Sequence, residues 1–276
     1  MLDYLSRMLE LIDFLKTYES KSRYSEQDVR RTFFAKTANA VRVYYLGHDF
    51  EFIVSKLRAE GNYSPDEIPH IENLGWIMPE PSNRKFLHNY HSILKLNLLN
   101  GCWVCFESSL DEIFKAVIPA KAREKMELRY YHQVVNLPRG FEIHEELDER
   151  LRKRLRNRHI PINDKWNAIF KLGYPDHRNV KQDRDFLEFF SSCRNCMHNN
   201  SISFKDAHFE TKLGDFYFYK GKAINFITLD LIVNIVRELA EIYWALCSSV
   251  DYEGVIIDPY SDRWSNDSSP AFRLDH

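Results

Sequence analysis

The sequence contains few of the residues that interrupt helices. Its 276 residues include only 9 glycines and 10 prolines, too few for a β protein built from many tight turns. It has no run of about eighteen consecutive apolar residues, which a transmembrane helix requires. The start, Met1-Leu2-Asp3-Tyr4, does not resemble a signal peptide. We therefore expect a helical protein of the cytoplasm that does not enter a membrane.

Excess charge and cysteine are also scarce. The net charge is −2, so any binding of nucleic acid must use a local patch rather than a general electrostatic attraction. The 5 cysteines include the pairs Cys102/Cys105 and Cys193/Cys196. Four thiolates could bind zinc, but both pairs fall in helical patterns, where cysteine serves as a small hydrophobe. We expect reduced thiols, no metal and no cofactor.

Helical periodicity covers most of the chain. Apolar residues recur at spacings of three and four, the pattern of amphipathic helices, in residues 2–17, 25–59, 83–117, 122–133, 164–172, 183–197 and 229–248. Ser25 and Thr228 have the character of helix N-caps. Residues 216–226 predict a β-hairpin with its turn at Gly221, and residues near 209–213 could add a strand before a turn at Gly214-Asp215. The pattern predicts an all-α fold with a short hairpin before the last helix.

Changes in composition predict four regions. Residues 1–60 form an N-terminal helical region, and residues 61–82 form a linker that contains four prolines. Residues 83–248 form the main helical domain, and residues 249–276 form an irregular tail.

A basic run precedes the second half of the main domain. Its cations are Arg150, Arg152, Lys153, Arg154, Arg156 and Arg158. They follow the acidic residues 142–149, an order that suits the helix dipole and helical ion pairs. A solvated helix is one interpretation, and a face that binds RNA phosphates is the other.

The sharpest functional signal is Arg194-Asn195-Cys196-Met197-His198-Asn199-Asn200. Arg194 and His198 are four residues apart, so on a helix they lie on one face and can contact a common ligand. Arginine is a permanent cation, and histidine titrates near neutral pH, which is a useful combination for phosphate chemistry. The pair Asn199-Asn200 suits the end of a helix, because asparagine tolerates the left-handed conformation that a helix end often needs.

An acidic residue lies within the longest predicted helix. Glu107 is surrounded in sequence by apolar residues of the 83–117 pattern. A buried carboxylate requires a partner, and an arginine from a facing helix such as Arg194 would be suitable. The alternative is that Glu107 belongs to a polar stripe at the surface.

The order of these features resembles the HEPN superfamily (higher eukaryotes and prokaryotes nucleotide-binding). The resemblance covers roughly residues 83–248 and rests on the helix with Glu107, the Arg194 to Asn200 motif, the hairpin and the last amphipathic helix. Three residues separate Arg194 from His198, fewer than in the usual family motif, so we interpret the motif as a variant. The pair Arg154 and His159 has the usual spacing but lies in the charge run, and we regard it as a coincidence.

The resemblance implies a HEPN-like helical bundle that dimerises and cleaves RNA without metal. His198 would act as general base or acid, Arg194 would hold the scissile phosphate, and Asn195 or Asn199 would orient these groups. The products would be a 2′,3′-cyclic phosphate and a 5′-hydroxyl. Host defence or a toxin system, with an antitoxin or another protein partner, would suit such an activity. The alternatives are a non-catalytic module that binds a nucleotide, RNA or protein, and a scaffold role for the N-terminal helices.

Overall fold

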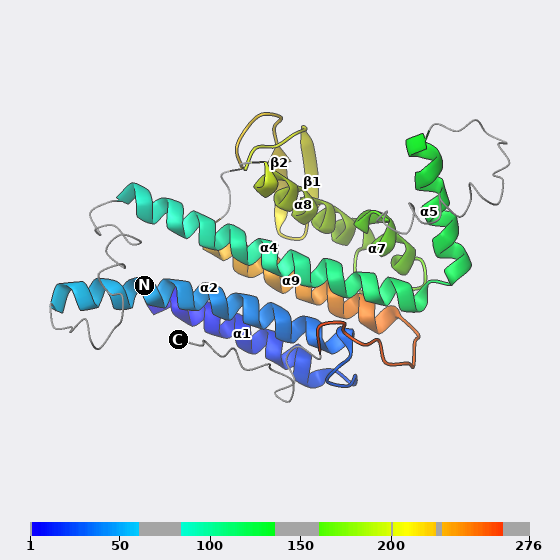
Figure 1. Cartoon of the computed structure of the whole chain (residues 1–276), viewed down its shortest axis with the longest axis horizontal. Coiled ribbons are helices and arrows are strands. Elements are labelled where there is room, and N and C mark those ends of the chain that lie inside the picture. Colours follow the sequence, from blue (N-terminus) through cyan, green and yellow to red (C-terminus); the bar gives the residue numbers. More distant parts are fainter. Residues whose placement is uncertain (1, 61–83, 136–159, 200, 225–227, 262–276) are drawn as a thin grey trace, which may run out of the picture. The chain divides into compact units, whose positions relative to one another are not determined.

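The structure is a computed structural model that describes residues 2–60, 84–135, 160–199, 201–224 and 228–261. Its elements, in chain order, are α1 (Leu2–Lys21), α2 (Val29–Glu60), α4 (Arg84–Val117), α5 (Ala120–Val135), α7 (Ile162–Phe170), α8 (Val180–His198), β1 (Ala207–Thr211), β2 (Gly214–Phe218) and α9 (Leu229–Ser249) (Figure 1). The predicted helical fold with a hairpin before the last helix is confirmed. Among the described helices, none combines the length and the hydrophobicity that a membrane span needs.

The chain forms two compact units, and each unit combines three separate stretches. Unit 1 comprises Met1–Ser22, Phe33–Cys105 and Gln182–Glu241, and unit 2 comprises Arg23–Thr32, Phe106–Lys181 and Ile242–His276. The candidate Arg194 motif belongs to unit 1. The linker predicted at residues 61–82 lies outside the described residues, and the predicted domain boundaries stay predictions.

The N-terminal helix α1 packs within unit 1 against α2 and α9. Tyr18 of α1 stacks on Phe34 of α2 with ring centroids 5.4 Å apart. Arg7 of α1 forms an ion pair with Asp230 near the start of α9. The apolar face of α1 is buried, as its periodicity predicts, through Met8, Leu11, Ile12 and Leu15. The first helix is therefore part of the core of unit 1.

Helix α4 packs against α2 and α8 in the same unit. At Gly101, an added methyl group would lie only 3.5 Å from the Cβ of Ala40, so the two helices approach closely there. Trp103 is buried and meets Phe190 of α8 edge to face, with centroids 5.2 Å apart. Aromatic pairs in this geometry add about 0.5–1.5 kcal/mol to the burial of their area. These contacts place α8, which carries Arg194, in the core of unit 1.

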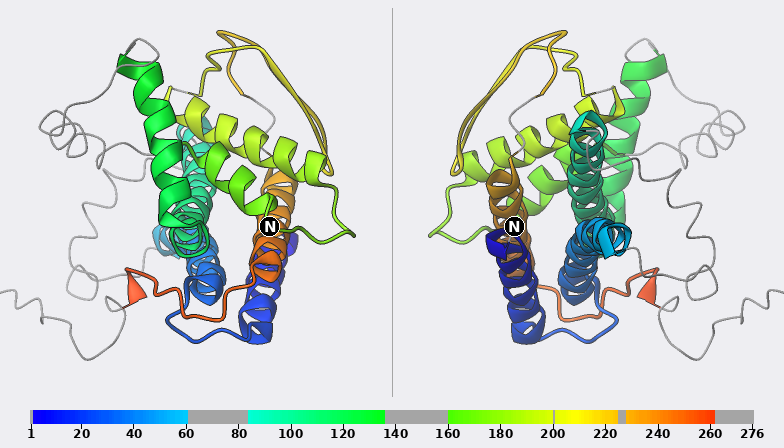
Figure 2. Two further views of the ribbon diagram at one scale, coloured as in Figure 1. Left: turned by 90° about the vertical axis from the view of Figure 1, so that its right-hand side faces the viewer. Right: turned by 90° about the vertical axis from the view of Figure 1, so that its left-hand side faces the viewer.

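The β-hairpin covers one side of α8 (Figures 1 and 2). Phe216 of β2 stacks on Phe189 of α8 with centroids 4.0 Å apart. The strands pair in antiparallel register with Phe209 opposite Phe216. At the other side, Lys212 in the turn contacts Glu238 of α9 at 3.1 Å. The hairpin is therefore fixed by two helices of unit 1.

The turn predicted at Gly221 does not join the two regular strands, whereas the additional strand expected near residues 209–213 is confirmed as β1. The regular strands are joined by Lys212 and Leu213, and the backbone leaves this turn at Gly214 with a φ of 119°. Gly221 does form a turn with a positive φ of 73°, but it follows β2 instead of joining the two strands. Burial decides which strand pairs with β2, because β1 supplies Phe209 to the apolar face that packs on α8.

Unit 2 is held together by charged side chains that link α4, α5 and α7. Lys165 of α7 is 2% exposed and forms an ion pair with Asp111 of α4. Lys115 contacts the same carboxylate at 2.8 Å. Burial raises the pKa of Asp111, but the hydrogen bonds from Lys115 and Lys165 outweigh burial, so its pKa lies below the ordinary value. Arg129 of α5 contacts Asp164 of α7 at 2.6 Å.

Helix starts follow the predicted caps in one case and not in the other. Thr228 caps α9, where its side-chain oxygen accepts the backbone N–H of Leu231 at 3.2 Å. The prediction of Ser25 as the cap of the second helix is wrong, because α2 begins at Val29 and the Asp28 carboxylate accepts the backbone N–H of Arg30 at 2.9 Å. Helix α2 also continues without a break through Gly47.

Candidate functional site

Helix α8 positions the predicted catalytic residues at its C-terminal end. The helix buries one face against the core of unit 1 through Phe186, Phe189, Phe190, Cys193 and Cys196. Arg194 follows Cys193 and is half-buried, and Asn195 is exposed. The buried apolar face of α8 therefore holds the backbone of the motif in place, while Arg194 and Asn195 remain partly or fully accessible to solvent.

The guanidinium of Arg194 has few protein partners. Its Nη1 donates a hydrogen bond to the side-chain oxygen of Asn195 at 3.3 Å. Its Nε is buried and has no hydrogen-bond partner among the described residues. Within the same part of the chain, no carboxylate forms an ion pair with Arg194. A half-buried arginine with a neutral partner keeps donors for an anion such as phosphate.

His198 is the last residue of α8, and its side chain lies outside the described part of the structure. The helical backbone is continuous from Arg194 to His198. Four residues of helix correspond to a rise of about 6 Å and a rotation close to one full turn. The backbone thus places both residues on the same side of α8, as the spacing predicts.

The chain leaves α8 through a tight loop. Asn199 donates from its side-chain nitrogen to the carbonyl of Ile202 at 3.0 Å, and the backbone N–H of Ser201 bonds to the carbonyl of Cys196 at 2.8 Å. Among the described residues of this loop, the positive φ of 63° belongs to Ser201 and not to Asn199. Asn200 lies outside the described residues. Asn199 therefore holds the loop that follows the motif.

The structure does not test whether the other predicted site residues lie near this end of α8. Glu107 is half-buried on the part of α4 that belongs to unit 2, so its pairing with Arg194 stays a prediction. The basic run from Arg150 to Arg158 lies outside the described residues, and its role in RNA binding also stays a prediction.

The cysteines have the environment of core residues. All five are free thiols, and burial raises the pKa of Cys102 and Cys193 well above the ordinary value. A thiol that does not ionise is a poor nucleophile and a poor metal ligand. Across the described ranges, no group of three or more His, Cys, Asp or Glu side chains is arranged to hold a metal ion.

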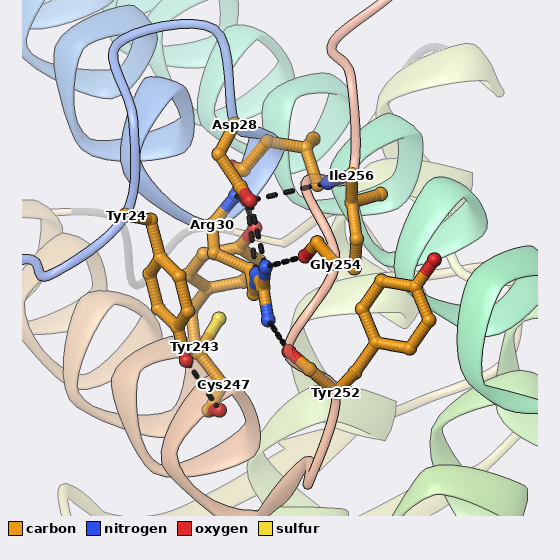
Figure 3. Close-up of polar contacts among 9 residues, drawn as sticks. Tyr24, Asp28, Arg30, Tyr243, Cys247, Tyr252, Gly254 and Ile256 are labelled. Atoms are coloured by element: carbon orange, nitrogen blue, oxygen red, sulfur yellow. Dashed lines mark hydrogen bonds and ion pairs between the residues drawn. The ribbon is translucent and has the colours of Figure 1, made fainter.

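Unit 2 contains a buried polar cluster that the sequence did not reveal (Figure 3). Asp28 and Arg30 are each 1% exposed and form an ion pair at 2.7 Å. Arg30 also donates to the carbonyls of Tyr252 at 2.8 Å and Gly254 at 2.6 Å. Its guanidinium lies 3.7 Å from the ring centroid of Tyr24. The cluster joins the start of α2 to the segment that follows α9.

The geometry of this cluster is that of a structural site. Asp28 accepts two bonds from the Arg30 side chain, one from the Arg30 backbone and one from the Ile256 backbone. Arginine has five N–H donors, and four of its hydrogen bonds here go to protein acceptors. No part of the pair is exposed to a ligand. A signal for part of it did exist, since Asp28 immediately precedes α2 and aspartate is a preferred N-cap residue.

No protein-family model, curated protein or solved structure matches this chain in any of the three comparisons.

Proposed function

We propose that this protein is a metal-independent endoribonuclease of HEPN type that acts through Arg194 and His198. The single observation that supports it most is the state of Arg194, a half-buried guanidinium whose side-chain partner is the neutral Asn195. It lies one helical turn before His198 at the end of a helix that is anchored in the core. This combination suits a phosphate with a titratable group beside it.

The protein needs to supply only a proton acceptor, a proton donor and a cation that binds the phosphate, because RNA carries its own nucleophile. The 2′-hydroxyl transfers its proton to one imidazole and attacks the adjacent phosphorus, while the 5′-oxygen of the departing strand takes a proton from a second imidazole. The products are a 2′,3′-cyclic phosphate and a 5′-hydroxyl. Arg194 binds the phosphate and offsets the charge that develops on its oxygens. A dimer, which we include in the proposal, supplies the second imidazole as His198 of the partner subunit.

The test is cleavage of several RNAs in excess EDTA by the wild type and by point variants. His198→Ala removes the general base or acid, which is expected to lower the rate about 10²- to 10⁴-fold. Arg194→Ala removes the phosphate contacts and is expected to cost about 10²- to 10³-fold. Arg194→Lys keeps the charge but loses the planar fork, so we expect an intermediate rate.

Matched controls come from exposed or distant members of the same residue types. Arg184 lies on α8 ten residues before Arg194, and His177 is exposed in the turn before α8. Arg184→Ala and His177→Ala should cleave at the wild-type rate. Equal loss in the controls and in the site variants would point to a folding defect. A wild type that binds RNA without cleaving it would favour the non-catalytic binding module instead.

A further inference from the structure

The two arms of the hairpin continue toward α8 beyond the regular strands. Ser203 donates its backbone N–H to Lys222 at 3.0 Å, and Gly221 donates to Ser203 at 2.8 Å. Ile202 pairs with Ala223 in an isolated bridge. Because Ser201 is bonded to Cys196 in the last turns of α8, this end of the hairpin is tied to the helix that carries Arg194.

Aromatic rings are exposed on these arms. Phe204 is 64% exposed, Tyr219 is 61% exposed and Tyr217 is 51% exposed. Phe209, Phe216 and Phe218 on the opposite face of the hairpin all pack against Phe189. The core therefore does not account for the three exposed rings, and several large exposed apolar side chains on one short hairpin are typical of a binding surface.

Tyr217 is held ready for stacking. Its ring lies on the ring of His208 with centroids 4.4 Å apart and an interplanar angle of 5°. The two residues are direct neighbours across the strands. A ring that is fixed by a partner on one face loses little freedom when a further planar group stacks on it.

Lysines alternate with these rings. Lys205 follows Phe204, Lys220 follows Tyr219, and Lys222 is two residues further on; all three lysines are exposed. None of them forms an ion pair with a carboxylate in the described residues. Lys212, at the far turn, differs because Glu238 and Glu241 neutralise it. Asp206, whose carboxylate accepts the backbone N–H of Lys220 at 2.9 Å, is an acid beside the three exposed lysines. In the described residues, the three lysines thus leave an excess of positive charge at the end of the hairpin that is tied to α8.

We infer that this aromatic and basic surface, which we call the hairpin platform (Phe204, Lys205, Tyr217, Tyr219, Lys220 and Lys222), binds a single-stranded segment of RNA. Unpaired bases stack on the rings, and the lysines contact the adjacent phosphates, which is how proteins bind single strands without reading sequence. The inference deepens the proposed function, on which it rests, by giving the ribonuclease an unpaired substrate.

The first test is binding of a labelled single strand by the 276-residue chain carrying His198→Ala, so that cleavage does not interfere. Fluorescence anisotropy is measured with a mixed-sequence RNA of about 20 nucleotides, longer than the site of a typical single-strand binding fold, and with the same sequence as a duplex. The triple variant Phe204→Leu, Tyr217→Leu, Tyr219→Leu should bind at least about 5-fold more weakly for each ring that stacks on a base. The control pair Tyr217→Phe, Tyr219→Phe keeps both rings and should bind as the parent does.

The second test measures the salt dependence of the same binding. The variant Lys205→Gln, Lys220→Gln, Lys222→Gln should lower the slope of log K against log salt by about 2, since each phosphate contact on a single strand contributes about 0.7. Far-UV circular dichroism checks that all variants fold. Equal affinity of the triple leucine variant, an unchanged salt slope, equal affinity for the duplex, or no binding of RNA would each overturn the inference.

The binding experiments on the hairpin platform and the cleavage experiments on Arg194 and His198 can succeed or fail independently. Ring-dependent binding by a wild type that never cleaves RNA would support the platform and contradict the ribonuclease. Cleavage that depends on Arg194 and His198 but not on the three rings would support the ribonuclease and contradict the platform.

Discussion

The buried pair of Asp28 and Arg30 provides the most quantitative test of the fold. Asp28→Ala leaves the guanidinium of Arg30 buried with only the carbonyls of Tyr252 and Gly254 as partners. Removing one member of a buried ion pair costs about 3–5 kcal/mol, and the loss of a helix cap costs about 1 kcal/mol. Because one carboxylate makes both contributions, we expect a total of about 4–6 kcal/mol, a large part of the stability of a typical domain.

Arg30→Ala should cost somewhat less than Asp28→Ala. The carboxylate would keep the backbone N–H groups of residue 30 and of Ile256 at 2.9 and 3.1 Å. The double variant should lose about 1–3 kcal/mol less than the sum of the two single losses, because both remove the same interaction. Burial lowers the pKa of Arg30, but the hydrogen bonds that it donates to Asp28 and the charge of Asp28 together outweigh burial, so the pKa of Arg30 lies above its ordinary value.

The assay is urea unfolding followed by circular dichroism, combined with hydrogen exchange at Ile256 and Asp258. These amides bond to Asp28 and to the Gln27 carbonyl, so they should lose protection first in the variants. Arg31→Ala is the matched control, because Arg31 meets an 86% exposed Glu26 at 3.6 Å and such surface pairs contribute less than about 1 kcal/mol. Losses below about 1 kcal/mol for both buried residues would refute the reasoning.

Three further predictions concern stability and are checked by thermal or urea unfolding. Gly101→Ala should raise the free energy of unfolding by up to about 1 kcal/mol, because alanine favours a helix interior more than glycine does. The added methyl group would make an ordinary contact with the Cβ of Ala40 at 3.5 Å. A loss of stability would mean that α2 and α4 have no room for this methyl group. Thr228→Ala should destabilise by about 1 kcal/mol through loss of the N-cap bond at 3.2 Å, whereas Thr228→Ser should not. The lowered pKa of Asp111 stabilises the fold above the pKa of an unfolded Asp, about 3.9, and this contribution disappears as pH falls through the folded pKa. In Asp111→Asn, the free energy of unfolding should therefore fall less steeply as the pH drops below about 4. The same pH dependence in the variant and the wild type would contradict this role of Asp111.

Local patterns were sufficient for most of the helices. The helix predicted at 83–117 is α4 at Arg84–Val117, and Thr228 caps α9 as expected. Both follow from apolar spacing and from the chemistry of one side chain, and neither depends on distant residues. The same reasoning placed Arg194 and His198 near the end of α8, where the helix ends at His198.

The errors come from choices that only tertiary contacts decide. Gly214 and Gly221 are both turn glycines with positive φ, and the packing of Phe216 on Phe189 selects the first as the hairpin turn. Arg30 and its acceptor Tyr252 are 222 residues apart, so their contact leaves no local pattern. Function is harder to predict than the fold, because a helix end positions Arg194 without revealing what it binds.

We propose that RNA supplies the nucleophile, that Arg194 binds the scissile phosphate and that His198 transfers the protons. The most direct measurement uses an RNA that the wild type cleaves in EDTA and a copy with a single 2′-deoxy nucleotide on the 5′ side of the cleaved bond. We expect 2′,3′-cyclic phosphate and 5′-hydroxyl ends from the first RNA and no cleavage at the deoxy position of the second. Cleavage of the deoxy bond, or fragments with plain 3′-hydroxyl ends, would contradict it.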